Sequence, residues 1–436
     1  MGLMEFFDKL AEPEDEKLMG VFKKLYGPFV QIALIYPSFR RENLPLTFFL
    51  FIFTFSVFLY HYYLLSMSIF KSLDNFELAS LAFHYWMIFT FTLITLPLLI
   101  INRHKMGETH RYLQDNLGEY KSVKIYQEGK PTQYEKNKRL EFIRFLFLPG
   151  MVVCLASGLL LIPYIRRFTN PPHYSENGVN LNLPIAAWYP YSTHEGINHG
   201  LAVLGQLMTG GNLALTLGTL EVILFRVAQS IIFEYKVLQY GIETVFSRAK
   251  KLYWKRNASL AKAHIHFKDP EYQKCVTECF KECVRHHYKI RVVLAGFEYL
   301  IKWPGALAYG FGTGVIGLSL VNVLIAKESE NYENVVLFLL LSVVESLNMF
   351  MLSVIGESIT TETKVLRDEL YFIEWYKLDI TNRRMMLNFQ MGVTNPVIVY
   401  AGGLVALCMD TFSSIMNTSY SFFNLVNADM GNKDEK

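Results

Sequence analysis

Seven apolar runs, each long enough to cross a lipid bilayer as a helix, constrain the fold of this chain more than any other feature. They cover residues 46–68, 80–101, 142–164, 199–224, 292–326, 334–355 and 396–415. The hydrocarbon core of a bilayer is ~30 Å thick, and a helix of ~20 residues spans it. Because a helix also satisfies its own backbone hydrogen bonds in lipid, the runs predict seven transmembrane helices, S1 to S7 in chain order.

Lys and Arg residues are distributed very unevenly among the segments outside these runs. Of the 42, 34 lie before S1, between S2 and S3, between S4 and S5 and between S6 and S7, whereas six lie in the four alternate segments. Cytoplasmic segments of membrane proteins carry the excess of Lys and Arg. We therefore expect a cytoplasmic N-terminus and an extracellular C-terminus, the reverse of a G-protein-coupled receptor.

The composition supports a membrane protein and excludes other classes. Hydrophobic residues make up 52% of the chain and charged residues 19%, which suits a surface that faces lipid. The net charge of +3 is too small to indicate a nucleic-acid partner. The first residues are acidic and lack the apolar core of a cleavable signal peptide, so S1 is expected to direct insertion.

The sequence contains no recognisable catalytic or metal-binding pattern. Four potential metal ligands recur at every fourth position: Cys275, Cys279, Cys283 and His287. On a helix this spacing spreads them along ~18 Å, too far for one ion, so we expect the cysteines to be buried core residues. Walker, HExxH and G-x-S-x-G motifs are absent from the sequence, so we expect neither a cofactor nor an enzyme. His84 and His199 are expected to be single histidines that are solvated or hydrogen-bonded.

The segments around the spans complete an all-α polytopic architecture. Residues 1–45 form a cytoplasmic N-terminus with an interfacial or re-entrant element at 18–35, and residues 46–225 form S1 to S4 with an ordered, proline-rich outer lid at 165–199. Charged residues at helical spacing predict that S4 and S5 extend through 226–291 into a cytoplasmic anchor. S5 and S6 occupy 292–356, an amphipathic anchor helix 357–394, the S7 helix 395–427 and an extracellular tail 428–436.

Three ionisable residues lie inside or near apolar spans, where charge is costly and a partner or a water path is expected. We expect Glu221 to be reached by water at the cytoplasmic end of S4, and Glu345 to face another helix. S7 is the most polar span, with Gly402, Gly403 and Asp410. Two interpretations of S7 stay open, namely a pore lining and close helix packing through small residues.

Three motifs carry a resemblance to a known family. They are LPIAAWYPY at 183–191 in the outer loop, DELYFIEWYKLD at 368–379 before S7, and TSYSFFNLV at 418–426. Together with the inverted seven-span topology, they resemble insect odorant receptors. The tail differs from that of gustatory receptors, and the chain lacks the long S4–S5 insertion of the shared co-receptor, so it resembles an odour-specific tuning subunit.

This resemblance implies a tetrameric, odorant-gated, non-selective cation channel, assembled with co-receptor subunits in the plasma membrane of olfactory sensory neurons. It places the binding site for a small volatile ligand in the outer half of the bundle, with the matching residues Leu81, Tyr85, Ser157, Leu160, Tyr164, Met208, Asn212, Val336 and Phe338. It places S7 along the pore, with Asp410 in the lining and a hydrophobic gate at Phe422, Phe423 and Val426. The alternatives are a gustatory-type channel and a secondary transporter, although the sequence shows no internal repeat typical of transporters.

Overall fold

The computed structural model describes residues 44–102, 116–147, 178–194, 196–257, 265–330 and 332–434, and eight single positions between 105 and 154. These residues are predominantly helical. In chain order the elements are α4 (Leu44–Lys71), α5 (Phe76–Ile101), the 3-10 helix η1 (Ile125–Gln127), α7 (Gly129–Phe145), β1 (Val179–Asn180), β2 (Ala187–Trp188), α9 (Gly196–Glu243), α10 (Val245–Arg256), α11 (Pro270–Glu328), α12 (Tyr332–Phe372), the 3-10 helix η3 (Trp375–Lys377), α13 (Ile380–Gly392), β3 (Tyr400–Ala401), β4 (Val405–Ala406) and α14 (Met409–Asp434).

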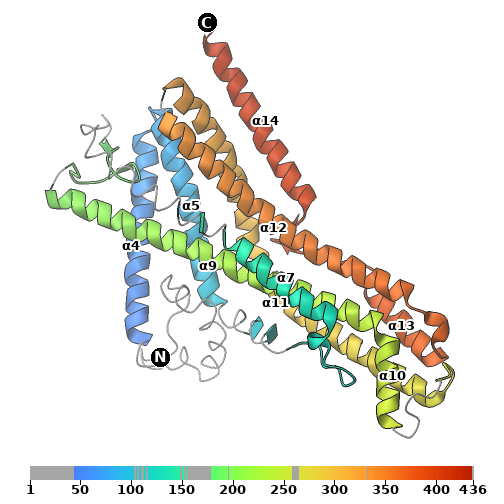
Figure 1. The fold of residues 1–436 in the computed structure, drawn as a ribbon. Helices are drawn as coiled ribbons and strands as arrows, with labels where there is room; N and C mark the ends of the chain where they lie inside the picture. Colours follow the sequence, from blue (N-terminus) through green and yellow to red (C-terminus); the bar gives the residue numbers. More distant parts are fainter. Residues whose placement is uncertain are drawn as a thin grey trace.

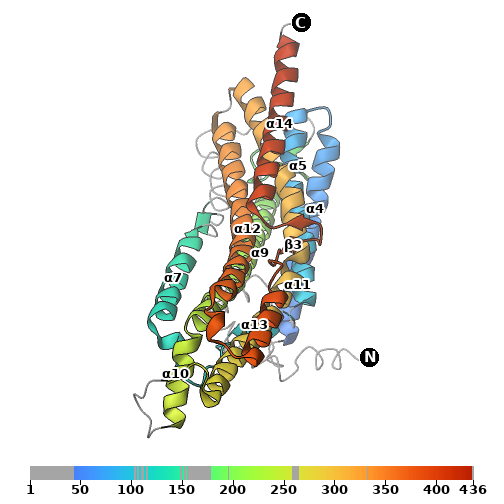
Figure 2. The same cartoon turned by 90° about the vertical axis from the view of Figure 1, so that its right-hand side faces the viewer.

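The molecule is elongated, and three long helices run through most of its length. Figures 1 and 2 show α9, α11 and α12 packed on one another, with α4 and α5 beside them at one end and α10 and α13 at the other. The C-terminal helix α14 packs against α11 and α12 and then projects from the molecule. The long helices therefore connect two chemically different ends.

Among the described residues, five helices are long and apolar enough to cross a membrane. They are Phe49–Lys71, Leu78–Leu98, Gly196–Glu243, Pro270–Glu328 and Asn334–Phe372. S1, S2, S4, S5 and S6 are thereby confirmed as apolar helices. Most of S3 and the whole N-terminal element at 18–35 lie outside the described residues. We call the apolar parts of the five helices the membrane bundle.

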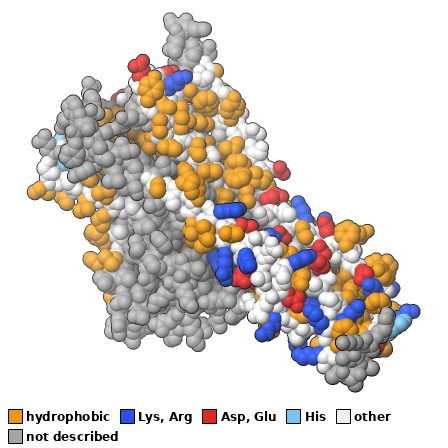
Figure 3. Space-filling model, in the orientation of Figure 1, with side chains coloured by type: hydrophobic (Ala, Val, Ile, Leu, Met, Phe, Trp, Pro, Cys, Tyr) orange, Lys and Arg blue, Asp and Glu red, His pale blue; other side chains and the backbone are white. Residues whose placement is uncertain are grey.

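A charged stem extends from this bundle. We define the stem as η1, α10, α13 and the adjoining parts of α9, α11 and α12 (residues 226–243, 270–291 and 357–372). Figure 3 shows Lys, Arg, Asp and Glu side chains gathered over this end and hydrophobic side chains over the bundle. Since α9 and α11 continue without a break into the stem, the predicted helical extensions of S4 and S5 are confirmed.

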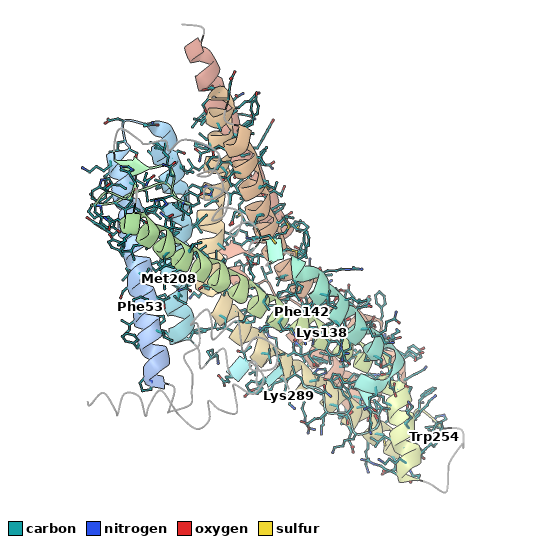
Figure 4. All side chains as sticks on the ribbon, turned by 60° about the vertical axis from the view of Figure 1, so that its left-hand side comes forward. Phe53, Lys138, Phe142, Met208, Trp254 and Lys289 are labelled. Carbon is teal, nitrogen blue, oxygen red and sulfur yellow. The ribbon has the colours of Figure 1, made fainter. Side chains whose placement is uncertain are left out.

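Helix α7 lies along α9 where the bundle meets the stem. The Nζ of Lys138 lies 4.7 Å from the ring centroid of Phe233, and the guanidinium of Arg226 lies 5.1 Å from the ring centroid of Phe142. Figure 4 shows Lys138 and Phe142 on α7, with Trp254 far along the stem on α10. Cation–π contacts of this kind fix the position of α7 against α9.

A buried ion pair lies in the interior of the stem. The Nη1 of Arg248 donates to Oε2 of Glu282 at 2.8 Å, and the two side chains are only 1% and 4% exposed. The Nη2 of Arg248 also donates to the carbonyl oxygen of Gly241 at 2.7 Å and to Sγ of Cys283 at 3.2 Å. Cys275, like the other two cysteines of its stripe, is buried, which confirms the prediction of core residues. Within the described ranges, no group of three metal-ligating side chains converges.

The prediction of one anchor helix over residues 357–394 was wrong. Instead, α12 continues from the membrane bundle to Phe372, the chain turns through η3, and α13 begins after Asp379, whose side chain accepts from the backbone N–H of Asn382 at 2.8 Å. The side chain of Gln273 on α11 holds this turn, because it donates to the carbonyl oxygen of Lys377 and accepts from the N–H of Asp379. The N-cap at Asp379 thus starts a new helix, although apolar residues recur at helical spacing throughout this segment.

The predicted start of S7 at Pro396 was also wrong. Residues 400–406 form a β-hairpin, in which Tyr400 pairs with Ala406 and Ala401 with Val405, and α14 begins only at Met409. Gly402 and Gly403 have φ of +63° and +76°, which a helix does not contain and which glycine adopts most easily. The helix then continues to Asp434, beyond the expected end near residue 427.

The described part of the outer loop is ordered against the bundle. β1 pairs with β2, and the backbone N–H of Trp188 donates to Oγ of Ser68 on α4 at 2.7 Å. On α9, the side chain of Gln206 pairs with both backbone polar groups of Ile185 at 2.9 Å. His199 is hydrogen-bonded as expected, with Nδ1 2.9 Å from the carbonyl oxygen of Thr193. The loop therefore packs across α4 and α9 as a lid.

Candidate functional site

A cavity of about 110 Å³ lies between α5, α9, α11 and α12 in the membrane bundle. Its described lining is mostly apolar and comprises Ile88, Phe91, Leu217, Leu220, Leu224, Pro304, Gly305, Ala308, Phe311, Gly312, Val315, Met351, Leu352 and Ile355, with the polar residues Glu221, Glu345 and Asn348. Each helix contributes residues three or four positions apart, which is the spacing of one helical face. A concave, apolar wall with a few polar groups is typical of small-molecule sites.

The three polar side chains come from two helices and meet in the cavity wall. Glu221 lies on α9, while Glu345 and Asn348 lie one turn apart on α12. The two carboxyl groups are close enough to interact electrostatically, and Asn348 hydrogen-bonds to Glu345. Oε2 of Glu221 and Oδ1 of Asn348 are buried and have no hydrogen-bond partner among the described residues. The cavity therefore contains unsatisfied acceptors.

Glycine on α11 makes room for this polar group. A Cβ at Gly312 would lie 2.7 Å from Oε1 of Glu345, so a larger residue at this point would force the carboxyl group to shift. Glu345 therefore faces another helix, as the sequence predicted. The expectation that water reaches Glu221 was wrong for Oε2, because α9 continues as a helix into the stem and packs this atom inside the protein.

The nine residues predicted for ligand binding lie elsewhere in the bundle or outside the described residues. Ser157, Leu160 and Tyr164 belong to the undescribed part of S3. None of the six described residues lines the cavity. Met208 (36% exposed; Figure 4) and Val336 (56% exposed) lie at the surface of the chain, and Asn212 on α9 accepts from Thr216 at 3.2 Å.

The structure brings the remaining predicted residues into the interior. Tyr85 is buried in a cluster that Leu81 packs against and that includes Ile185 of the lid. Phe338 is 3% exposed, and its ring centroid lies 5.9 Å from that of His84. His84 is hydrogen-bonded as expected, since its Nδ1 lies 3.3 Å from Oγ of Ser319.

The cavity lies deeper along the helices than these predicted residues. Tyr85 precedes the lining residue Ile88 by three positions, and Phe338 precedes Glu345 by seven. At 1.5 Å per residue these offsets correspond to about 4.5 Å and about 10 Å along α5 and α12. The predicted outer site and the cavity therefore share helices but differ in level.

Sequence reasoning missed all the apolar residues of the cavity, because an apolar lining residue looks like any other residue of a span. The only sequence signal was the pair of acids, Glu221 and Glu345, inside apolar runs. Combined with Gly312, which permits close approach on α11, that pair marks the level at which the helices enclose a cavity.

Helix α14 carries the residues predicted for the pore and gate. Asp410 is exposed in its first turn. The ring of Phe423 stacks on that of Tyr420 at 6.4 Å, Val426 is partly buried, and Tyr420, Phe422 and Leu425 are 61%, 48% and 70% exposed. Exposed apolar side chains therefore lie on more than one side of α14 within this single chain.

Helix α11 contacts both the cavity and α14. Gly312 and Val315 line the cavity. Two positions after Val315, a Cβ at Gly317 would lie 3.4 Å from Cδ1 of Phe422, so the ring packs directly on the α11 backbone. Two positions on a helix differ by about 200°, which places the two contacts on opposite sides of α11.

Three comparisons with known proteins agree with this geometry. A family model described as 7tm Odorant receptor matches residues 75–420. Odorant receptor 2a of Drosophila melanogaster is 21% identical over 160 residues, which cover 37% of this chain and 39% of that receptor. The matched segment thus spans well under half of the length of this relative.

Solved structures resemble the fold over almost the whole chain. The insect olfactory receptor OR5 of Machilis hrabei, in complex with eugenol, superposes with a TM-score of 0.71 at 11% identity and covers 94% of this chain and 99% of that one. A second structure of the same receptor gives a TM-score of 0.68 with the same coverage. The chain is thus an all-α polytopic membrane protein, and it belongs to the 7tm odorant receptor family.

Proposed function

We propose that this chain is the odour-specific subunit of a ligand-gated, non-selective cation channel and that it binds small volatile molecules within its helix bundle. The observation that carries this proposal is the cavity between α5, α9, α11 and α12, whose described lining is mostly apolar and includes a few polar atoms. Recognition of a volatile molecule in such a site depends mainly on shape and dispersion contacts.

The contacts of α11 supply a route from the cavity to the pore. A ligand between Glu345 and Val315 touches α12 and α11, and α14 packs on both of these helices. Pro304 lies within α11 beside the cavity and removes one backbone hydrogen bond, which allows the helix to bend there. A shift of α11 at Gly317 moves the ring of Phe422. Phe422, Phe423 and Val426 would form the hydrophobic gate that opens by rewetting.

The exposed apolar surface of α14 and the charged stem fit an oligomeric channel. In the proposed arrangement the N-terminus and the stem are cytoplasmic, the C-terminus is extracellular, and the channel is a heterotetramer with co-receptor subunits in the plasma membrane of olfactory sensory neurons. The alternatives are a gustatory-type channel and a transporter, and experiments distinguish them from the proposed channel. The residues predicted for ligand binding in the outer half of the bundle are proposed to form the entry to the cavity from the side of the lid. Among them, Tyr85 and Phe338 are described and buried.

A matched pair of substitutions tests this proposal. Val315→Phe fills part of the cavity, since Val315 is 4% exposed and lines it, whereas Val343→Phe adds the same ring at a position that is 51% exposed on α12. Cells that express each variant with a co-receptor are recorded against a panel of volatile compounds. We expect the half-maximal concentrations to rise at least roughly tenfold for Val315→Phe, as expected for loss of about 1.4 kcal/mol of binding, and to stay unchanged for Val343→Phe.

Two results would contradict the proposal. Equal odorant responses of the two variants, at equal surface expression, would remove the cavity as the ligand site. A flux of substrate without an electrical current in cells that express the wild type would identify a transporter instead.

A further inference from the structure

The polar end of the cavity has a chemistry that shape recognition does not explain. Among its described lining residues, Glu221 and Glu345 are the ionisable ones and both are acidic, and Asn348 contributes a carbonyl oxygen without a partner. The three groups present acceptor oxygens from α9 and from α12 to the same space. Buried polar atoms without partners are costly, which suggests that something else supplies donors here.

From this geometry we infer that the cavity binds a primary amine, with its ammonium group between Glu221, Glu345 and Asn348 and its hydrocarbon part against the apolar wall. An ammonium group has three N–H donors and no acceptor, which matches three acceptor side chains. Hydrogen bonds between an ammonium and a carboxyl oxygen are among the strongest in proteins. The inference rests on the proposed function, because it takes the cavity to be the ligand site.

The size of the cavity limits the amine. An apolar cavity of ~150 Å³ holds benzene, which has six non-hydrogen atoms, so in proportion a cavity of about 110 Å³ fits a molecule of roughly four non-hydrogen atoms. Ile88 and Phe91 on α5 and Leu220 on α9 supply the apolar contacts for a short alkyl chain. A short-chain volatile amine such as propylamine satisfies both requirements.

The arrangement also predicts discrimination against neutral molecules of the same shape. A hydroxyl group offers one donor and therefore leaves at least one of the two unpaired oxygens, Oε2 of Glu221 and Oδ1 of Asn348, unsatisfied. A site built for hydrogen bonding rejects a ligand that lacks the required donors more strongly than an apolar site rejects a ligand of the wrong length. Propylamine is therefore expected to bind more tightly than propan-1-ol, although the two have the same number of non-hydrogen atoms.

A binding experiment tests the inference without requiring channel opening. The full-length chain in nanodiscs of neutral lipid is titrated with propylamine and, separately, with propan-1-ol, and binding is measured by thermal shift. Glu221→Gln and Glu345→Gln keep the size of each side chain and remove the acid. Glu328→Gln, at the exposed end of α11, is the control. We expect either cavity variant to weaken propylamine binding roughly tenfold to hundredfold, and neither to change propan-1-ol binding by more than about twofold.

The outcomes separate this inference from the proposed channel function. Equal affinity of the wild type for the amine and the alcohol, or unchanged amine binding in both cavity variants, would overturn the amine site, and odorant-evoked currents would still support the channel. Amine binding that is lost only in the cavity variants supports the amine site. If this binding result is obtained and cells that express the chain show no current, only the channel proposal is contradicted.

Discussion

The buried ion pair of the stem offers the sharpest test of how the cytoplasmic part is stabilised. Arg248→Met removes the guanidinium and leaves Glu282, which is 4% exposed, without its counter-charge. Glu282 then keeps one described hydrogen bond, from the backbone N–H of Lys121 at 2.9 Å. Removal of one partner of a buried pair costs about 3–5 kcal/mol, because the other charge stays buried. The pair of Lys274 and Glu271 is exposed and should contribute far less, so Lys274→Met is the matched control.

A double-mutant cycle distinguishes loss of the ion pair from loss of packing. Glu282→Gln keeps an acceptor for Lys121 and removes the charge, so the double variant with Arg248→Met buries no unpaired charge. Unfolding by detergent titration, followed through the fluorescence of Trp254 on α10, should give a coupling energy of at least about 2 kcal/mol. A cost of Arg248→Met below about 1 kcal/mol, or additive costs in the cycle, would refute the reasoning.

Three further predictions follow from local geometry. Burial against Phe389 lowers the pKa of His287 to about 4, so the folded state favours the neutral ring. The free energy of unfolding is therefore unaffected by this group above pH ~6.5 and decreases by up to about 3 kcal/mol as the pH drops toward 4. This decrease should be absent from the pH profile of unfolding of His287→Asn. Gly356→Ala should lower the melting temperature markedly, because a Cβ there would overlap the backbone oxygen of Leu407, whereas Gly392→Ala meets nothing within 4 Å and should not. Phe422→Ala should raise the current measured without odorant, because it removes a ring from the proposed gate, and an unchanged basal current would exclude Phe422 from the gate.

The sequence predicted the helical elements better than their ends. Long apolar runs determine where helices can lie in lipid, so S1, S2, S4, S5 and S6 were found correctly, and charge at helical spacing revealed the stem. The hairpin at residues 400–406 was missed because a short apolar strand and a buried helix share the same composition. The adjacent glycines, Gly402 and Gly403, were a signal for a turn, but they were assigned to the S7 helix, either in a pore lining or at a closely packed helix face.

The candidate site was harder to predict than the fold, for a physical reason. A cavity depends on which faces of four helices meet and on where their side chains fail to fill the space, and neither is encoded in the pattern of one helix. Ile88 and Val315 look like ordinary residues of a span. Among the residues that line the cavity, Glu221 and Glu345 broke the local rule that spans are apolar, and such exceptions are concentrated at functional sites.

The position of the two acids connects ligand binding to the movement proposed for the pore. Glu221 lies on α9 and Glu345 on α12, with Gly312 of α11 against the second carboxyl group. A ligand that donates to both acids joins α9 to α12 across the cavity and is in contact with α11. Because α11 and α12 are the helices on which α14 packs, the free energy gained at the polar end acts on the two elements that hold the gate. A ligand shifts a conformational equilibrium only through its differential affinity for the two states. Satisfying the buried acceptors in only one arrangement of α9 and α12 would supply that difference.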